Sequence, residues 1–528
     1  MKKTDFRHNH SFMAVLVAGS TLLLFFCSSL RHALFKSNAF DLGLLDQFTY
    51  LLSQGLPPVV SLVGYNFFGD HVALIFYPLS LLYRIYPDVH WLLFIQALSL
   101  SLGSWIVWAL AKQAQLSERK ARILAIAYLL YPVIFNANLY DFHSEVIAIP
   151  ALLGAVWSAR ARKIGLFLGL VLLVLSCKVV LSLTVAAMGI WLWGWEKQRK
   201  LGLMALGLGV AWFAIATQWI IPSILAVEHH AVSRYAYLGD SLGEIVLNLF
   251  LKPQIILGRV FSLDTLEYLA LLLFPVAWGL SWLDLAPLFC TLPTLAINIL
   301  SDVSAQRNLV MQYSLPILPF LILAIISAWQ RDRIWLKSHH FILTWCAIAF
   351  LALAKYGYFW TIYLDSLDTW SANRDAIALV QPSRSVLTAS HIAPHLTHRQ
   401  NIQIATFGSE SLDLSQFHYI LLSQRNPNWQ SSPETVQALI AKIESLPQFQ
   451  LIFERDGVVL YSVISQQSSV ISFGQPTTNN QQPTTNPSAS PTDCETPNPA
   501  PDEPGRSRIS SRPQKATKAS NSPQRGLY

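Results

Sequence analysis

Apolar runs without charged residues recur along the first two thirds of the chain. A helix that crosses ~30 Å of hydrocarbon needs roughly 20 apolar residues, or somewhat fewer where the bilayer thins. We therefore predict an all-α polytopic membrane domain over residues 1–360, with about eleven transmembrane helices. The eleven candidate runs are 11–30, 89–111, 123–140, 146–159, 164–177, 179–195, 201–227, 268–283, 285–301, 308–330 and 338–354.

The basic residues between these runs predict the orientation. With a cytoplasmic N-terminus, 16 Lys and Arg residues fall in five short inner segments and nine fall in the much longer outer loops. Such a bias toward the cytoplasmic side is the usual one for membrane proteins. The first run has no small-residue cleavage site soon after it, so we interpret it as an uncleaved anchor. We expect a multi-pass protein of the plasma (inner) membrane whose C-terminal region lies outside the cytoplasm.

The first outer loop, residues 31–88, is unusually long. Residues 42–54 and 72–87 within it are apolar enough to lie along a membrane surface. If 72–87 crossed the membrane, the orientation of every later loop would be inverted. The sequence therefore predicts two interfacial helices in this loop.

The pattern changes after the last apolar run. Residues 374–465 alternate between strand-like segments and one helical segment, 433–446, and Asp456-Gly457 has the residue types of a hairpin turn. These features predict a small α/β extracytoplasmic domain. Residues 466–528 are rich in Pro, Ser, Thr, Asn and Gln. We predict a disordered low-complexity tail there, because this composition cannot bury a core.

Composition excludes several classes of protein. Hydrophobic residues make up 53% of the chain and charged residues 13%, about half of the ~25% that is usual in soluble domains. The formal net charge of +7 is accounted for mainly by orientation, and we predict no nucleic-acid partner. The five cysteines have no metal-ligand or redox spacing.

A few ionisable residues lie where the outer loops meet the bilayer. Such groups are costly at this depth unless they face a cavity, a partner or a substrate. Alternatives remain open: Asp41 and Asp70 could each cap the interfacial helix that follows, and the loop around residue 143 could be a solvated turn. The set comprises Asp41, Asp70, His71, Asp141, His143 and Glu145.

Two cations complete the candidates. Lys178 lies between two short apolar runs, where it could extend to the membrane surface or meet a lipid phosphate or a carboxylate. Arg234 lies in the third outer loop, 228–267, where contact with anionic lipid or phosphate competes with a simple solvated loop.

The chain resembles a bacterial family of predicted membrane proteins of unknown function that is related to the GT-C superfamily of membrane glycosyltransferases. The resemblance covers about 12–465 and includes the turn at Lys178. Its other segments are Phe40-Asp41-Leu42-Gly43 with Gln47, Gly69-Asp70-His71, Asp141-Phe142-His143-Ser144-Glu145, Ser390 to Leu396, and Arg455 to Leu460.

The resemblance implies a function. GT-C enzymes pass a sugar from a polyprenyl-phosphate carrier to an acceptor at the outer face, and Asp41 stands at the position of their catalytic acid residue, which acts as a base. The remaining loop acids and histidines would bind acceptor hydroxyls or a hard divalent ion, Mg²⁺ or Mn²⁺. The expected partners are a polyprenyl-phosphate sugar and membrane lipid. The sequence departs from the family at one turn, where Val179 and Val180 follow Lys178 in place of acids.

Two other functions remain open from the sequence. One is a transporter or flippase of a lipid-linked or small polar substrate, and the other is a non-catalytic anchor for an envelope-binding domain. Transporters place charged groups near the membrane midplane, whereas the groups of this chain cluster at one side.

Overall fold

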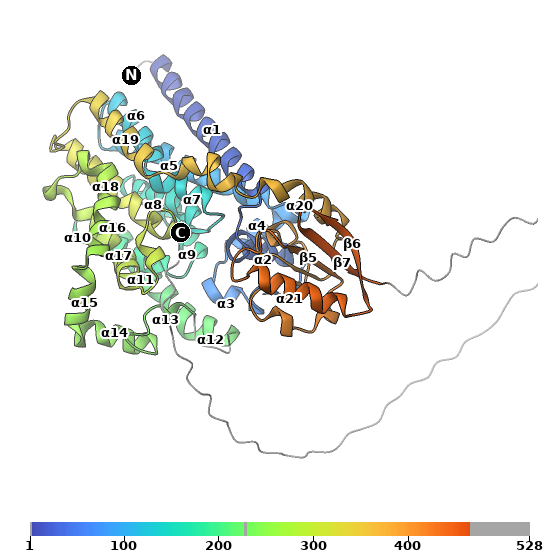
Figure 1. The fold of residues 1–528 in the computed structure, drawn as a ribbon. Coiled ribbons are helices and arrows are strands. Elements are labelled where there is room, and N and C mark those ends of the chain that lie inside the picture. Colours follow the sequence, from blue (N-terminus) through green and yellow to red (C-terminus); the bar gives the residue numbers. More distant parts are fainter. Residues whose placement is uncertain (1–2, 226–229, 465–528) are drawn as a thin grey trace, which may run out of the picture. The chain divides into compact units, whose positions relative to one another are not determined.

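The computed structural model describes residues 3–225 and 230–464 (Figure 1). Within them, five helices are long and apolar enough to cross a membrane, and the number rises to seven if each of two bent helix pairs counts as one span. The five lie within His10–Ala33, His90–Gln113, Glu118–Leu139, Arg199–Ile224 and Gln312–Gln330. All five overlap predicted runs, whereas the predicted total of eleven rests also on shorter helices.

A shorter helix packs closely on one of the long ones because small residues lie between them. The helices α10 (Leu181–Gly194) and α11 (Arg199–Ile215) approach at Gly189 and Gly202. A Cβ atom at Gly189 would lie only 2.6 Å from the Gly202 carbonyl oxygen. Small residues that allow such backbone approach are typical of helix contacts within membranes. This packing fixes the start of α10, which directly follows the turn at Lys178.

The segment 31–88, predicted as the first outer loop, contains helices at both places where interfacial helices are predicted. After α1 (Lys3–Ala33) comes a π-helical turn, η1 (Ala39–Gly43), followed by α2 (Leu44–Ser53). A short hairpin of β1 (Val59–Val60) and β2 (Tyr65–Asn66) then leads to α3 (Phe68–His71) and α4 (Phe76–Ile85). The apolar faces of α2 and α4 meet where the rings of Phe48 and Phe76 lie 5.1 Å apart. The helices therefore bury their apolar sides against each other and the membrane domain.

The C-terminal part of the described chain is an α/β unit with a five-stranded sheet in the order β4-β3-β5-β7-β6. Strand β3 pairs in parallel with β4 and β5, and β7 pairs antiparallel with β5 and β6. The predicted helix and hairpin are confirmed. The elements are α20 (Leu367–Leu379), β3 (Val386–Thr388), β4 (Ile402–Ile404), β5 (Tyr419–Ser423), α21 (Pro433–Glu444), β6 (Phe449–Arg455) and β7 (Val458–Val463).

Local residue preferences explain these elements. Ser432 caps α21 by accepting a hydrogen bond from the Thr435 amide, and Pro433 occupies the first helical position, where a missing N–H costs nothing. Asp456 and Gly457 both have positive φ, 53° and 78°, as a tight hairpin of this hand requires. The predicted tail, 466–528, lies outside the described residues, as do 226–229, which include the end of the predicted run 201–227.

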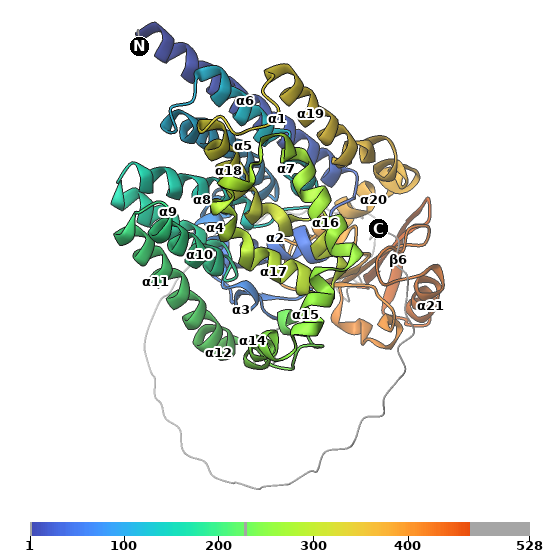
Figure 2. The same ribbon diagram turned by 90° about the vertical axis from the view of Figure 1, so that its left-hand side faces the viewer.

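Hydrogen bonds join the α/β unit to the first outer loop. Ser61 accepts from the Ile402 amide at 2.9 Å and donates to the Ile402 carbonyl at 2.8 Å, so it pairs with the edge strand β4. The Gln47 amide donates to the Arg399 carbonyl, and the Trp370 indole donates to the Ala33 carbonyl at the end of α1. In both ribbon views the sheet lies beside the end of α1 that leads into this loop (Figures 1 and 2).

Candidate functional site

Asp41 lies in the π-helical turn η1, directly after the first membrane helix. The cap of this turn is Asn38, whose side-chain oxygen accepts from the Phe40 amide at 2.9 Å. Asp41 is therefore not needed as a cap, and its side chain is 20% exposed. The interpretation of Asp41 as a helix cap is wrong, and the same holds for Asp70, which lies inside α3 and caps neither α3 nor α4.

Asp141 holds two loops and the end of α1 together. Its carboxylate accepts two hydrogen bonds from the Arg31 guanidinium, one of them 3.3 Å long, and a third from the Asn38 amide at 2.9 Å. Asp141 is 1% exposed and has φ of +89°, a conformation that costs energy for any residue with a side chain. The backbone at 140–144 is thus held in a strained form by an ion pair.

His143 brings this loop to Asp41. Its Nε2 atom lies 3.4 Å from Asp41 Oδ1, and its backbone amide donates to the Gln96 side chain. The ring stacks on Tyr140, with centroids 5.6 Å apart. The ring is therefore positioned from two sides, and its nitrogen faces the carboxylate of the first outer loop.

Glu145 and Lys178 form an ion pair at the start of α8 (Glu145–Arg160) and the end of α9 (Ile164–Cys177). The distance between Lys178 Nζ and Glu145 Oε1 is 2.7 Å. Although burial alone would lower the pKa of Lys178, the Glu145 carboxylate outweighs burial and raises this pKa. The sequence left three positions open for Lys178: at the membrane surface, at a lipid phosphate or at a carboxylate. In the structure its partner is a carboxylate.

The segment Asp70-His71 reaches the same group. The His71 carbonyl accepts from the Val179 amide at 3.0 Å, next to Lys178. Its imidazole lies 3.2 Å from Asp70, but burial lowers the pKa of His71 to about 4 even though the Asp70 charge acts in the opposite direction. His71 is therefore neutral near pH 7. Together, four chain segments supply one cluster of acids, histidines and cations.

Arg234 lies outside this cluster of ion pairs in the described residues. Its backbone carbonyl accepts from the Asp302 amide at 2.9 Å, and within residues 3–225 and 230–464 its side chain forms no ion pair with the other candidates. The proposed contact of Arg234 with a phosphate thus stays a prediction.

Sequence reasoning missed two residues of the site. Arg31 was recognised only as one of the outer charges, although its position at the end of an apolar run, facing an acidic loop, was a usable signal. Asp46 was passed over, yet it is 1% exposed and accepts from Tyr83 Oη at 2.5 Å, from Thr397 Oγ1 and from His398 Nε2 at 3.1 Å. No local pattern marks this role, because Thr397 and His398 lie in the α/β unit.

The donor set does not fit the expected Mg²⁺ or Mn²⁺ site. Among the described residues, no three His, Cys, Asp or Glu side chains are arranged to hold a metal ion. The reason is chemical: Arg31 occupies the Asp141 carboxylate, and Lys178 occupies that of Glu145. Two of the four carboxylates in the cluster are thus already neutralised, and we derive no step through a metal.

Comparisons with known proteins come from a family model and from solved structures. The model described as "Predicted membrane protein (DUF2079)" matches residues 31–460. Among solved structures, ArnT from Cupriavidus metallidurans bound to undecaprenyl phosphate matches with a TM-score of 0.49 and 12% identity, and ArnT in the apo state with 0.41 and 12%. Each match covers 86% of this chain and 98% of ArnT. No protein with a curated description matches the sequence.

Proposed function

The chain belongs to the DUF2079 family of predicted membrane proteins, and we propose that it is a membrane glycosyltransferase. It would transfer a sugar from a polyprenyl-phosphate-linked donor to an acceptor hydroxyl at the outer face of the membrane, with Asp41 as the base. One observation carries this assignment: Asp41 is the most exposed carboxylate of the cluster, and its neighbour is a histidine rather than a fixed cation.

The other carboxylates are less suited to act as a base. Side-chain exposure is 20% for Asp41, 15% for Asp70, 7% for Glu145 and 1% for Asp141. A general base needs a lone pair within hydrogen-bonding reach of the substrate. The carboxylate of Glu145 is paired with Lys178, and that of Asp141 is paired with Arg31. The Asp70 carboxylate also interacts electrostatically with the Lys178 charge. These groups position the loops, and Asp41 remains available.

In the proposed step, the acceptor hydroxyl gives its proton to Asp41. The hydroxyl oxygen then forms a bond to the anomeric carbon while the bond from that carbon to the phosphate oxygen breaks. Polyprenyl phosphate leaves with the bonding electron pair, and the anomeric configuration inverts. Holding the two reactants in line contributes to such catalysis.

Lys178 would assist the leaving phosphate. An ammonium group has three N–H donors, and its bond to Glu145 uses one. Within residues 3–225 and 230–464 this group forms no second hydrogen bond, so its other donors are available to a phosphate oxygen, whose negative charge grows as the bond breaks. The departure at Val179 and Val180 is compatible with this role, because neither valine adds a carboxylate that would compete with a phosphate for Lys178.

The placement of the charges also bears on the alternatives. Arg31 lies at the end of α1, and Glu145 and Lys178 lie at the ends of α8 and α9. A rim position favours chemistry at the surface over transport through the midplane of broken helices. For the anchor alternative, the α/β unit would be expected to act independently, whereas it is bonded to the first outer loop through Asp46, Gln47 and Ser61.

The experiment reconstitutes the full chain in liposomes with a polyprenyl-phosphate hexose labelled in the sugar, together with a membrane extract as the source of acceptors. A glycosyltransferase releases free polyprenyl phosphate and moves the label to a new product. A flippase instead moves the donor intact to the other leaflet. If the donor is neither cleaved nor moved for each hexose tested, while the protein remains folded, the proposed function is wrong.

A further inference from the structure

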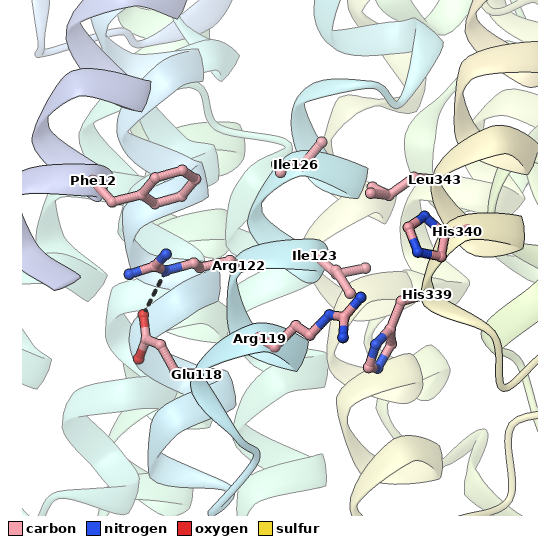
Figure 3. Close-up of a pocket in the computed structure, with 9 residues that line it drawn as sticks. All are labelled: Phe12, Glu118, Arg119, Arg122, Ile123, Ile126, His339, His340 and Leu343. Atoms are coloured by element: carbon pink, nitrogen blue, oxygen red, sulfur yellow. Dashed lines mark hydrogen bonds and ion pairs between the residues drawn. The ribbon is translucent and has the colours of Figure 1, made fainter.

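We propose that a second site, at the opposite end of α1 from Asp41, binds the phosphate-bearing headgroup of an anionic membrane phospholipid. A cavity of about 450 Å³ opens there between α1, α6 (Glu118–Leu129) and α19 (His339–Leu353). This volume lies within the range of ~300–1,000 Å³ that is usual for ligand sites. Its lining includes Phe12, Arg119, Arg122, His339, His340 and Leu343 (Figure 3).

The charge of this cavity is positive. Its one acid, Glu118, already accepts from Arg122 Nε at 3.0 Å and from the Trp108 indole at 3.0 Å, and Lys112 lies 3.5 Å from it. Arg119, by contrast, has no ion-pair partner among the described residues. Figure 3 shows the Arg119 guanidinium directed toward His339 rather than toward an acid. An anion would therefore find a guanidinium whose charge is not yet neutralised.

The apolar lining favours a lipid as the source of that anion. Phe12, Ile126 and Leu343 line the cavity together with the basic groups, and the Arg122 guanidinium lies 4.4 Å from the Phe12 ring centroid. A free phosphate ion makes no favourable contact with apolar side chains, whereas a phospholipid carries a phosphate and acyl chains in one molecule. Basic pockets between transmembrane helices are typical sites for anionic headgroups.

The position of the cavity, at the ends of apolar helical segments, is the one expected for a site that binds a membrane lipid. It lies where three apolar helical segments begin: His10–Ala33, Glu118–Leu139 and His339–Leu353. Phe12 of α1, Arg119 of α6 and His339 of α19 line the same cavity. This end holds basic segments that the sequence predicts to be cytoplasmic. Because Phe12 and Arg31 are both in α1, they are separated by roughly 28 Å at 1.5 Å per residue, about one hydrocarbon thickness.

The lipid site is therefore separate from the candidate transferase site, and neither proposal depends on the other. The test uses the full chain in a neutral detergent and measures its binding of phosphatidylglycerol and phosphatidylcholine by native mass spectrometry. We expect phosphatidylglycerol to bind more tightly. Arg119→Gln should weaken this binding about fivefold, because one surface cation contributes about that much to the attraction of an anionic lipid.

The control is Lys200→Gln, which removes a charge from an exposed residue in another predicted cytoplasmic segment; it should leave the affinity unchanged. If Arg119→Gln fails to fold, His340→Gln is used in its place, and it should also weaken the binding of phosphatidylglycerol. Equal binding of the two lipids would overturn the proposal. So would equal effects of Arg119→Gln and Lys200→Gln, or displacement of the lipid by millimolar inorganic phosphate, which would show a site for the free ion.

Discussion

The Nε2 atom of His143 lies 3.4 Å from Oδ1 of Asp41. This contact joins the turn after the first membrane helix to the short loop at 140–144, and the ion pair between Arg31 and Asp141 joins the end of α1 to the same loop. Side chains that are far apart in the sequence therefore share one site. The arrangement gives His143 a defined task, which is to hold the Asp41 carboxylate in place.

We expect His143→Gln to reduce sugar transfer about 10- to 100-fold, since misplacing a reacting group by ~1 Å has effects of this size. Because His143 is a positioning residue, kcat should fall more than KM rises. The matched control is Tyr140→Phe, which retains the stacked ring beside His143 and should keep most of the activity. A purely structural role for His143 would instead lower the melting temperature without this change in kcat.

The Glu145–Lys178 pair predicts a characteristic pattern of stability. Both residues are largely buried, with side-chain exposures of 7% and 13%. Lys178→Met leaves an unpaired carboxylate and should destabilise the protein by ~3–5 kcal/mol, whereas the double variant Glu145→Gln/Lys178→Met should recover much of this loss. Thermal unfolding of the purified protein in detergent ranks the variants. Equal destabilisation by the single and double variants would show that the pair is not coupled.

The contact of the α/β unit with the first outer loop should weaken in alkaline solution. Burial alone would lower the pKa of His398, but the Asp46 carboxylate outweighs it and raises the pKa. Charged His398 therefore stabilises the contact fully below its ordinary pKa of ~6.5, and this contribution is lost as the pH rises through the raised value. The protection factor for hydrogen exchange at residues 397–404, which is corrected for the intrinsic rise of the exchange rate with pH, should fall above neutral pH. In His398→Gln, this fall in the protection factor should be absent.

Two buried histidines should make the folded protein less stable in acid. Burial lowers the pKa of His391 to about 3 and that of His395 to about 4, so both are neutral in the folded protein. Because unfolded histidine takes up a proton near pH ~6.5, stability should fall as the pH drops from about 6.5 toward 4. Neither nitrogen of His391 has a hydrogen-bond partner in the described residues. His391→Leu should flatten the acid side of a plot of melting temperature against pH, and an unchanged slope would contradict this.

Local sequence signals predicted much of the fold. Asp456-Gly457 marked the hairpin, the residues of α21 formed a helical pattern, and the two interfacial helices followed from apolar stretches in a loop that had to remain on one side. The number of membrane crossings is harder to predict. Segments such as α9 and α10, with 14 residues each, are short for a bilayer. The close approach of α10 to α11 at Gly189 and Gly202 does not show as a long apolar run in the sequence.

The candidate site was predictable only in part. Asp41, Asp141, His143 and Glu145 stood out because charges interrupt apolar sequence there, and the structure brings them together. Their pairing did not follow from the sequence, because the residue type does not show whether a carboxylate is paired with an arginine or has no cationic partner. Asp46 shows the limit most clearly: its partners Thr397 and His398 come from another part of the chain, and only the folded protein shows why a buried acid is tolerated there.

The most direct test of the central claim compares Asp41→Asn with the wild-type protein in proteoliposomes that contain a polyprenyl-phosphate hexose. The measured quantity is the rate at which free polyprenyl phosphate appears, with Asp240→Asn, a change at an exposed residue of the third outer loop, as the control. The account predicts that Asp41→Asn remains folded and that its rate falls ~10²–10⁴-fold, the usual contribution of a general base, while the control is unaffected. An Asp41→Asn protein that releases polyprenyl phosphate at the wild-type rate would contradict it.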